Sequence, residues 1–308
     1  MALDADTLLD RMQLKQLITR WRTIAIVMAC LALVVFFGRM RDVSPIAGSH
    51  IARVTIEGVI TDDPAQQKLL ADLRDDKNVK AVLVKMDTPG GTAVGGEELY
   101  LGIRHIAEVK PVVIEMRTLC ASAGYMAALG GDYLLAREGT LTGSIGVIMQ
   151  SAEFTGLAEK LGITPITIKS GPNKASPNPL EKMTSGQREV IEGVVADFYR
   201  FFTRMVGERR HMEPAKVATL ADGRIFTGRQ ALDAGLIDAL GGEKEALDWL
   251  ATTHNISRKI AIHDVKPKKD DESLFGEFGE WAGQSFFSLK NLHVTLDGLV
   301  SIWHPATL

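Results

Sequence analysis

Two short segments of the chain carry residues suited to acyl-transfer chemistry. Residues 87–91 (DTPGG) follow an apolar run, and their paired glycines allow a sharp turn with unobstructed amides. Amides presented in this way bind an anion or a developing oxyanion. Residues 120–125 (CASAGY) place Ser122 among small residues at the predicted start of a helix. Ser122 is therefore either a nucleophile on a tight turn or an ordinary helix-capping serine.

A serine nucleophile also needs a base. None of the seven histidines lies between His105 and His211, and the sequence around them indicates no partner for Ser122. Lys174, in a loop of turn-forming residues, is the better candidate, although solvated loop lysines are common. Lysine has an ordinary pKa of about 10.4, so it acts as a base only where burial disfavours its ammonium form. A hydroxyl from Ser144 or Thr142 would orient such an amine without restoring its proton.

The hydrophobic patterning indicates the elements that hold these residues. Strands are predicted at residues 51–60, 79–86, 111–116, 133–136, 143–149 and 166–169. Helices are predicted at residues 66–75, 97–107, 122–129, 154–160 and 185–209. This alternation of strands and helices predicts an α/β fold with a largely parallel sheet.

An uncharged run near the N-terminus has the composition of a membrane segment. Residues 24–38 carry no charge, and residues 21–40 would span about 30 Å as a helix, which matches a bilayer core. A cleaved signal peptide and a buried core helix are the alternatives, but the flanking arginines and the lack of a strong cleavage motif favour an uncleaved anchor. Four basic residues precede the run and two closely follow it, which predicts a cytoplasmic N-terminus.

We therefore expect a single-pass protein of the inner (plasma) membrane whose main domain lies on the periplasmic, extracytoplasmic side. The expected parts are a cytoplasmic segment (1–20), a transmembrane helix (21–40), a linker (41–50), a catalytic domain (51–248) and a C-terminal extension (249–308). The extension is rich in Phe, Trp and Leu beyond residue 273. It would dock on the core, on a neighbouring subunit or on the membrane, and the sequence does not choose among these.

Composition narrows the classes of function. With 46% hydrophobic and 24% charged residues the chain can bury a core, and its formal net charge of −3 gives no support to a nucleic-acid binder. Two cysteines, Cys30 and Cys120, are too few for a disulfide scaffold. The sequence has no CxxC motif and no dense His/Cys cluster, so no structural metal is indicated.

Taken together, several segments resemble the signal peptide peptidase A family, serine–lysine peptidases of the Clp protease/crotonase superfamily. The similar segments are residues 87–91 (DTPGG), 121–125 (ASAGY), 139–147 (GTLTGSIGV), 170–174 (SGPNK), 221–228 (ADGRIFTG) and 234–238 (AGLID). The resemblance extends from Ile51 to about Asp248, in the short, single-repeat form of the family. It implies a Clp protease/crotonase-like fold of ββα units behind the N-terminal anchor.

The resemblance also implies a role for each site residue. Ser122 would attack the scissile carbonyl, Lys174 would be the general base, and Ser144 would hold the lysine amine. The amides of Gly91 and Ala123 would form the oxyanion hole. Two departures from the family pattern concern these positions: Ala123 stands where the family usually has Gly, and Ala175 stands where it often has Asp. The first could narrow the neighbouring pocket, and the second slightly weakens the choice of Lys174 over Lys169 or Lys182.

By the same resemblance, the substrates would be remnant signal peptides left in the membrane after their release from exported proteins. The expected assembly is a ring-shaped homo-oligomer of eight subunits, in which Lys174 serves its own subunit or a neighbour. No cofactor or metal is implied. Two other functions compete with this one: a crotonase-type acyl-thioester enzyme, whose expected glutamates are not evident, and a catalytically inactive membrane scaffold, which the joint presence of Ser122, Lys174 and Ser144 disfavours.

Overall fold

The computed structural model describes residues 18, 20–29, 48–267 and 300–302, and the chain divides into two units, residues 1–48 and 49–308. In the first unit, residues 18 and 20–29 are helical and exposed. Within the described residues, no helix combines the length and apolar character needed to cross a bilayer. The predicted span at 21–40 runs outside the described residues from position 30 onward, so the anchor stays a prediction.

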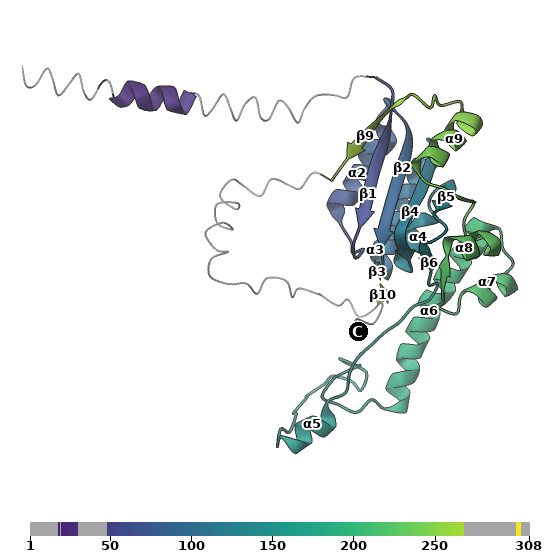
Figure 1. The fold of residues 1–308 in the computed structure, drawn as a ribbon. Coiled ribbons are helices and arrows are strands. Elements are labelled where there is room, and N and C mark those ends of the chain that lie inside the picture. Colours follow the sequence, from purple (N-terminus) through teal and green to yellow (C-terminus); the bar gives the residue numbers. More distant parts are fainter. Residues whose placement is uncertain (1–17, 19, 30–47, 268–299, 303–308) are drawn as a thin grey trace, which may run out of the picture. The chain divides into compact units, whose positions relative to one another are not determined.

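The second unit is built on an eight-stranded sheet (Figure 1). Its main path runs β7-β6-β4-β2-β1-β9, while β5 pairs with β4 and β8. All of these pairs are parallel except β6–β7, which confirms the predicted α/β fold with a largely parallel sheet. The strands are β1 (His50–Glu57), β2 (Val79–Thr88), β4 (Val112–Ala121), β5 (Tyr133–Ala136), β6 (Leu141–Gly143), β7 (Ile225–Thr227), β8 (Ala239–Leu240) and β9 (Ala261–Val265).

Alternate side chains of the central strands enter two separate cores, one on each face of the sheet. Val82 and Val84 of β2 belong to the larger core, which also contains side chains of α2 (Pro64–Asp75), α3 (Ala93–Ala107) and α4 (Ala123–Ala128). Ala81 and Leu83 belong to the smaller core, against α9 (Glu243–His254). Burial on both faces explains why β2 has an unbroken apolar stretch instead of a polar alternation.

The remaining helices follow β6. They are α5 (Thr155–Lys160), α6 (Ser185–Arg210), α7 (Pro214–Leu220) and α8 (Gly228–Ala234). The buried residues of α6 are Phe202, Met205 and Val206, all in its C-terminal half. Figure 1 shows α5 and the N-terminal end of α6 projecting from the sheet on the same side. The residues between Ser144 and α6 therefore belong to an extension that carries few core contacts.

Two predicted strands are wrong. In the stretch 143–149 only Gly143 lies in a strand, because Ser144 adopts a positive φ of 51° that ends the extended backbone. Residues 166–169 lie outside any strand, and Ile166 and Ile168 are 87% and 96% exposed. Their alternating pattern is typical of a strand, but the described part of the chain gives this segment no strand to pair with. The sheet also continues past residue 248, because β9 pairs with β1.

Candidate active site

Ser122 occupies a strained turn between β4 and α4. Its φ of 58° and ψ of −120° are rare for a residue with a Cβ, and the residue is only 2% exposed. Its hydroxyl makes no capping bond to α4, so the helix-capping interpretation is not the one the structure realises. Strained serines at sharp strand-to-helix turns present the hydroxyl for nucleophilic attack. The amide of Ser122 donates to the carbonyl of Gly143 at 2.8 Å, which fixes the turn to β6.

The pairing of β4 with β6 carries Ser144 to the same place. Cys120 lies opposite Thr142 and Ala121 opposite Gly143, so Ser122 and Ser144 follow directly on neighbouring strands. Both serines are buried and both have positive φ. Thr142, the alternative hydroxyl, donates to the carbonyl of Cys120 at 2.7 Å. Thr142 therefore holds the strand in position, and Ser144 is the hydroxyl that remains for the site.

Two buried neighbours of Ser122 have structural roles instead of reactive ones. Burial raises the pKa of the Cys120 thiol, so it stays protonated and unreactive. Burial also raises the pKa of Tyr125, whose hydroxyl donates to the carbonyl of Leu236 at 2.7 Å. The Tyr125 contact fixes the helix side of the turn that contains Ser122.

Gly91 lies in the short strand β3 (Gly90–Thr92), which packs against α4. A Cβ on Gly91 would lie 1.8 Å from the carbonyl oxygen of Ile60, so only glycine fits there. The amide of Ile60 donates to Gly90 and the amide of Thr92 donates to Ile60, each at 2.9 Å. The turn before β3 is held by Thr88, whose Oγ1 accepts from the amide of Gly90 at 3.1 Å.

These bonds also fix the direction of the Gly91 amide. Successive peptide groups of a strand point to opposite edges. Because Gly90 and Thr92 bond toward Ile60, the amide of Gly91 points to the other edge of β3. The sequence predicted the glycine turn, but it carried no sign of the backbone contact with Ile60, which comes from a segment about 30 residues earlier.

The methyl group of Ala123 is accommodated by a glycine of α3. Ala123 is fully buried, and a Cβ on Gly96 would come within 3.0 Å of the Cβ of Ala123. The methyl group of Ala123 therefore lies against the bare backbone of Gly96. Gly96 thus provides the space that the methyl group of Ala123 needs, and no sequence motif indicates this contact.

Lys174 lies in an exposed turn of the extension. Its amide donates to Gly171 at 3.2 Å, and the side chain of Gln187 donates to the carbonyl of Pro172 at 2.6 Å. This contact fastens the turn to the first turn of α6. From Gln187 to the buried Phe202 the helix rises about 22 Å. A single copy of the chain therefore leaves the Lys174 side chain exposed to water.

The two other lysines considered for the base are less suitable. Lys169 donates to the carboxylate of Glu181 and thereby lowers the pKa of that carboxyl group. A carboxylate partner favours the ammonium form of a lysine, which cannot accept a proton. Lys182 is exposed. The histidines before Ser122 are also poorly placed: His50 begins β1, at the strand end opposite to the site, and His105 lies near the end of α3, about 20 Å along the helix from Thr92.

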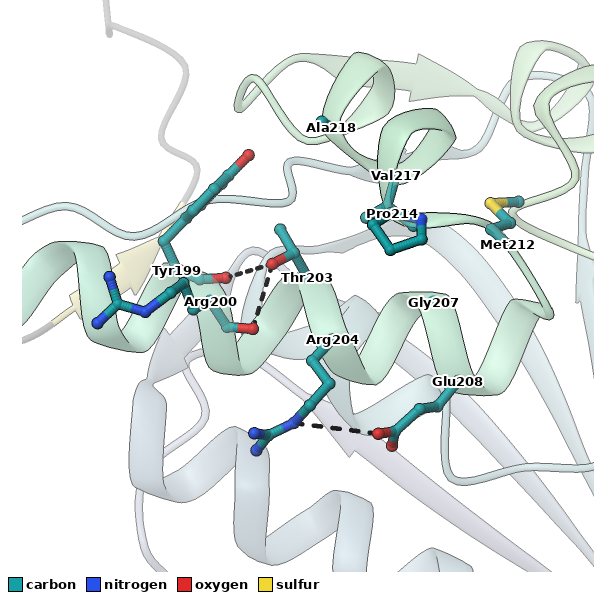
Figure 2. A pocket seen from close by; sticks show the side chains of 10 residues that line it. All are labelled: Tyr199, Arg200, Thr203, Arg204, Gly207, Glu208, Met212, Pro214, Val217 and Ala218. Atoms are coloured by element: carbon teal, nitrogen blue, oxygen red, sulfur yellow. Dashed lines mark hydrogen bonds and ion pairs between the residues drawn. The ribbon is translucent and has the colours of Figure 1, made fainter.

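Two pockets flank α6 and contain none of the predicted site residues. The first, of about 470 Å³, lies between α6 and α7 (Figure 2). Its lining includes Tyr199, Thr203, Met212 and Val217, and the Thr203 hydroxyl is turned back to carbonyls of its own helix. The second, of about 660 Å³, lies between residues 147–151 and the N-terminal half of α6. The first pocket belongs to α6 and α7, and the second lies between the extension and α6.

Within the described residues, no group of three or more His, Cys, Asp or Glu side chains is placed to hold a metal ion. A strained buried serine, a second buried serine beside it and a glycine amide that points away from Ile60 are together the parts of a serine hydrolase of the acyl-transfer type.

Comparisons with known proteins identify the class. The profile of peptidase family S49 matches residues 104–257, half of the chain, and the chain belongs to this family. It is 37% identical over 221 residues to a candidate protease of Synechocystis, which covers 71% of this chain and 80% of that protein. It is 32% identical over 272 residues to a candidate signal peptide peptidase SppA of Enterococcus faecium, which covers 83% of this chain and 77% of that protein.

Among solved structures, a mutant of ClpP1 from Listeria monocytogenes is similar at 16% identity and a TM-score of 0.44, covering 63% of this chain and 92% of the other. The α/β assignment itself rests on the strand order and pairing described above. With its family established, the chain is a serine protease.

Proposed function

We propose that the chain is a membrane-anchored serine endopeptidase with a Ser/Lys dyad that degrades remnant signal peptides in the inner membrane. Ser122 is the nucleophile, Lys174 is the general base, and Ser144 orients the lysine amine. The amides of Gly91 and Ala123 stabilise the oxyanion. The observation that carries this assignment is the strained, buried turn of Ser122, set between β3 and the β6 end that leads to Ser144.

The proposed reaction proceeds in two stages. The neutral amine of Lys174 takes the hydroxyl proton as the Ser122 oxygen attacks the scissile carbonyl carbon, and the two amides stabilise the oxyanion. The C–N bond then breaks, and the lysine returns the proton to the leaving amine. A water molecule, deprotonated by the same lysine, attacks the acyl-enzyme. The carboxylic product leaves as the Ser122 hydroxyl is restored.

We place Lys174 in the active site of a neighbouring copy of the chain. A base lysine must be removed from water, and the single chain leaves Lys174 exposed. The extension that carries it also exposes many apolar side chains, namely Ile148, Phe154, Leu157, Leu161, Ile163, Ile166 and Ile168. Exposed apolar surface of this extent is typical of an interaction site. A closed ring of copies, with eight subunits as the expected number, would cover this surface and remove the Lys174 amine from water.

The proposed substrate follows from the proposed anchor. A transmembrane helix at residues 21–40 would hold the catalytic domain at the extracytoplasmic face of the bilayer, where apolar signal peptides remain after cleavage. Residues 20–29 are helical, and their exposed side chains include Ile24, Ile26 and Val27. An apolar, exposed helical surface is the feature that a membrane segment requires.

The test is cleavage of an apolar signal peptide by the full chain in detergent. Ser122→Ala and Lys174→Ala are expected to remove nearly all turnover while the far-UV circular dichroism spectrum is retained. Lys169→Ala and Lys182→Ala are the matched controls and are expected to keep activity. The wild-type rate is expected to rise toward alkaline pH as the base loses its proton. An active Lys174→Ala variant, or a rate unchanged from pH 5 to pH 9, contradicts the proposal.

A further inference from the structure

The side chain of Arg209, near the C-terminal end of α6, holds the far end of α4. Its Nε donates to the carbonyl of Leu129 at 2.8 Å, and its Nη2 donates to the carbonyl of Gly131 at 2.9 Å. Leu129 is the C-terminal cap of α4. The guanidinium group of Arg209 therefore bonds the end of the helix that begins directly after Ser122.

The next residue of α6, Arg210, holds the segment to which α4 is bonded through Tyr125. Arg210 donates to the carbonyl of Gly235 and to the carboxylate of Asp238, each at 2.9 Å. Between these two residues lies Leu236, whose carbonyl accepts from the Tyr125 hydroxyl. The same half of α6 contains the buried residues of that helix, so it is a fixed support. Both attachments of α4 thus lead to one turn of α6.

The turn of Ser122 needs such attachments because its backbone is strained. A residue with a Cβ keeps a φ of 58° and a ψ of −120° only where its surroundings fix the chain on both sides. On the strand side, the Ser122 amide donates to the carbonyl of Gly143 at 2.8 Å. On the helix side, the Ser122 carbonyl accepts from the Met126 amide at 2.9 Å, and the Leu129 amide donates within the next turn at 3.1 Å. These bonds join Ser122 to the residue that Arg209 holds, about 10 Å away along the helix.

Arg209 suits this position in charge and in shape. The last carbonyls of a helix carry partial negative charge, and a planar guanidinium group can donate to two of them at once. Arg104 and Arg210 pair with Asp132 and Asp238, whereas Arg209 donates to carbonyls alone within the described residues. Burial is the main cause of a lowered pKa of Arg209, and the charge of Arg104 lowers it further. The Arg209 side chain is therefore committed to α4 although its partial removal from water is unfavourable.

We propose that Arg209 is a positioning residue that keeps the Ser122 hydroxyl in its attacking geometry by holding the far end of α4. This inference rests on the proposed function, because it takes Ser122 as the nucleophile. Arg209 does not touch the reacting atoms. Without its two bonds the last turn of α4 is free to unwind, and the strained turn of Ser122 relaxes toward an ordinary backbone conformation. Acylation then slows, while the binding of the substrate is unaffected.

The test measures kcat and KM of Arg209→Ala on an apolar peptide in the full chain. A displacement of about 1 Å at a reacting group costs on the order of 10²-fold in rate, so kcat is expected to fall by about 10- to 100-fold. An unchanged KM is expected, as for an interaction that acts only on the transition state. Arg204→Ala is the matched control, because Arg204 lies on the same helix, its side chain is 67% exposed and it pairs with Glu208 of that helix. A wild-type kcat in Arg209→Ala overturns the inference.

The labelling rate of Ser122 separates positioning from a general loss of stability. A fluorophosphonate is added at a temperature where circular dichroism shows wild type and variants to be folded. Arg209→Ala is expected to be labelled more slowly than wild type, and a less stable variant that is labelled at the wild-type rate overturns the inference. Arg209→Lys keeps the charge but not the planar guanidinium group, so its labelling rate and kcat are expected to lie between the other two. If Arg209→Ala does not fold, a wild-type kcat in Arg209→Lys overturns the inference.

Failure of this inference and failure of the proposed function give different results. If wild type neither cleaves peptides nor is labelled at Ser122, the proposed function fails. Hydrogen exchange of a peptide that contains residues 125–131 then still decides whether Arg209 holds α4. Faster exchange in Arg209→Ala than in wild type and Arg204→Ala is the expected result, and equal exchange in all three overturns the attachment.

Discussion

Replacing Gly91 with alanine tests whether the position of β3 controls catalysis. The new Cβ would lie 1.8 Å from the carbonyl oxygen of Ile60, and real Cβ atoms essentially never approach within 3.0 Å. Because 3.0 − 1.8 = 1.2, β3 must withdraw from Ile60 by at least 1.2 Å. The movement disrupts the two 2.9 Å bonds that join Ile60 to Gly90 and Thr92.

The expected size of the effect differs between stability and activity. Two backbone hydrogen bonds at about 1 kcal/mol each predict a loss of roughly 2 kcal/mol, which a typical folded domain tolerates. A displacement of about 1 Å at a reacting group costs on the order of 10²-fold in rate, and loss of one oxyanion donor costs about 10²–10³-fold in kcat. We therefore expect Gly91→Ala to fold and to lose at least about 10²-fold in kcat.

The assay measures kcat on an apolar peptide together with the urea midpoint of unfolding. Gly139→Ala is the matched control, because a Cβ there meets nothing within 4 Å and the backbone needs no positive φ. The control is expected to keep the kcat and the midpoint of the wild type. A Gly91→Ala variant with wild-type kcat would refute the placement of its amide in the oxyanion hole.

Two further predictions concern packing and pH. Gly96→Ala places a methyl group against that of Ala123 and is expected to lower both kcat and thermal stability. The double variant Gly96→Ala/Ala123→Gly is expected to recover most of both losses. No recovery would show that the two positions are not coupled. The hydrogen bond from Lys85 is the main cause of a lowered pKa of Glu243, and a hydrogen bond from Arg53 lowers it further. The ion pairs of Glu243 therefore stabilise the fold fully above the pKa of an unfolded glutamate, about 4.3. This stabilisation is lost as the pH falls through the lower pKa that Glu243 has in the folded chain. The free energy of unfolding of Glu243→Gln, measured with urea, is therefore expected to be lower than that of the wild type near neutral pH. The difference between the two is expected to shrink below about pH 4, and a difference that does not change with pH would contradict this.

Most of the fold could be predicted from the sequence, because the residue pattern within each main strand is enough to identify that strand. The apolar runs of β2 and β4 are buried on both faces, and β1 alternates buried apolar residues with more exposed polar ones, so their patterns identify all three as strands. The prediction was wrong where pairing, and not composition, decides. Residues 166–169 have a strand pattern but no strand beside them, and Ser144 ends β6 through a positive φ that no pattern encodes.

The site was predictable in its residue types but not in its backbone geometry. Ser122, Ser144 and Gly91 were named from motifs, and the structure brings their elements together through the β4–β6 register and the packing of β3 on α4. Ile60 acts through its backbone carbonyl and Gly96 through its lack of a side chain, so no sequence pattern identifies either residue. Motifs also indicate Lys174 as the base, but this lysine is exposed in one chain, so its amine needs a second copy of the chain to remove it from water.

The most direct test of the Ser122–Lys174 site is complementation between two inactive variants. Ser122→Ala and Lys174→Ala are co-expressed, purified as mixed oligomers and assayed on an apolar peptide beside each variant alone. If each Ser122 meets the lysine of one neighbour in a closed ring, random mixing restores roughly a quarter of the wild-type sites. Activity in the mixture, with neither variant active alone, is the predicted result. A mixture as inactive as its components would contradict a site completed between subunits.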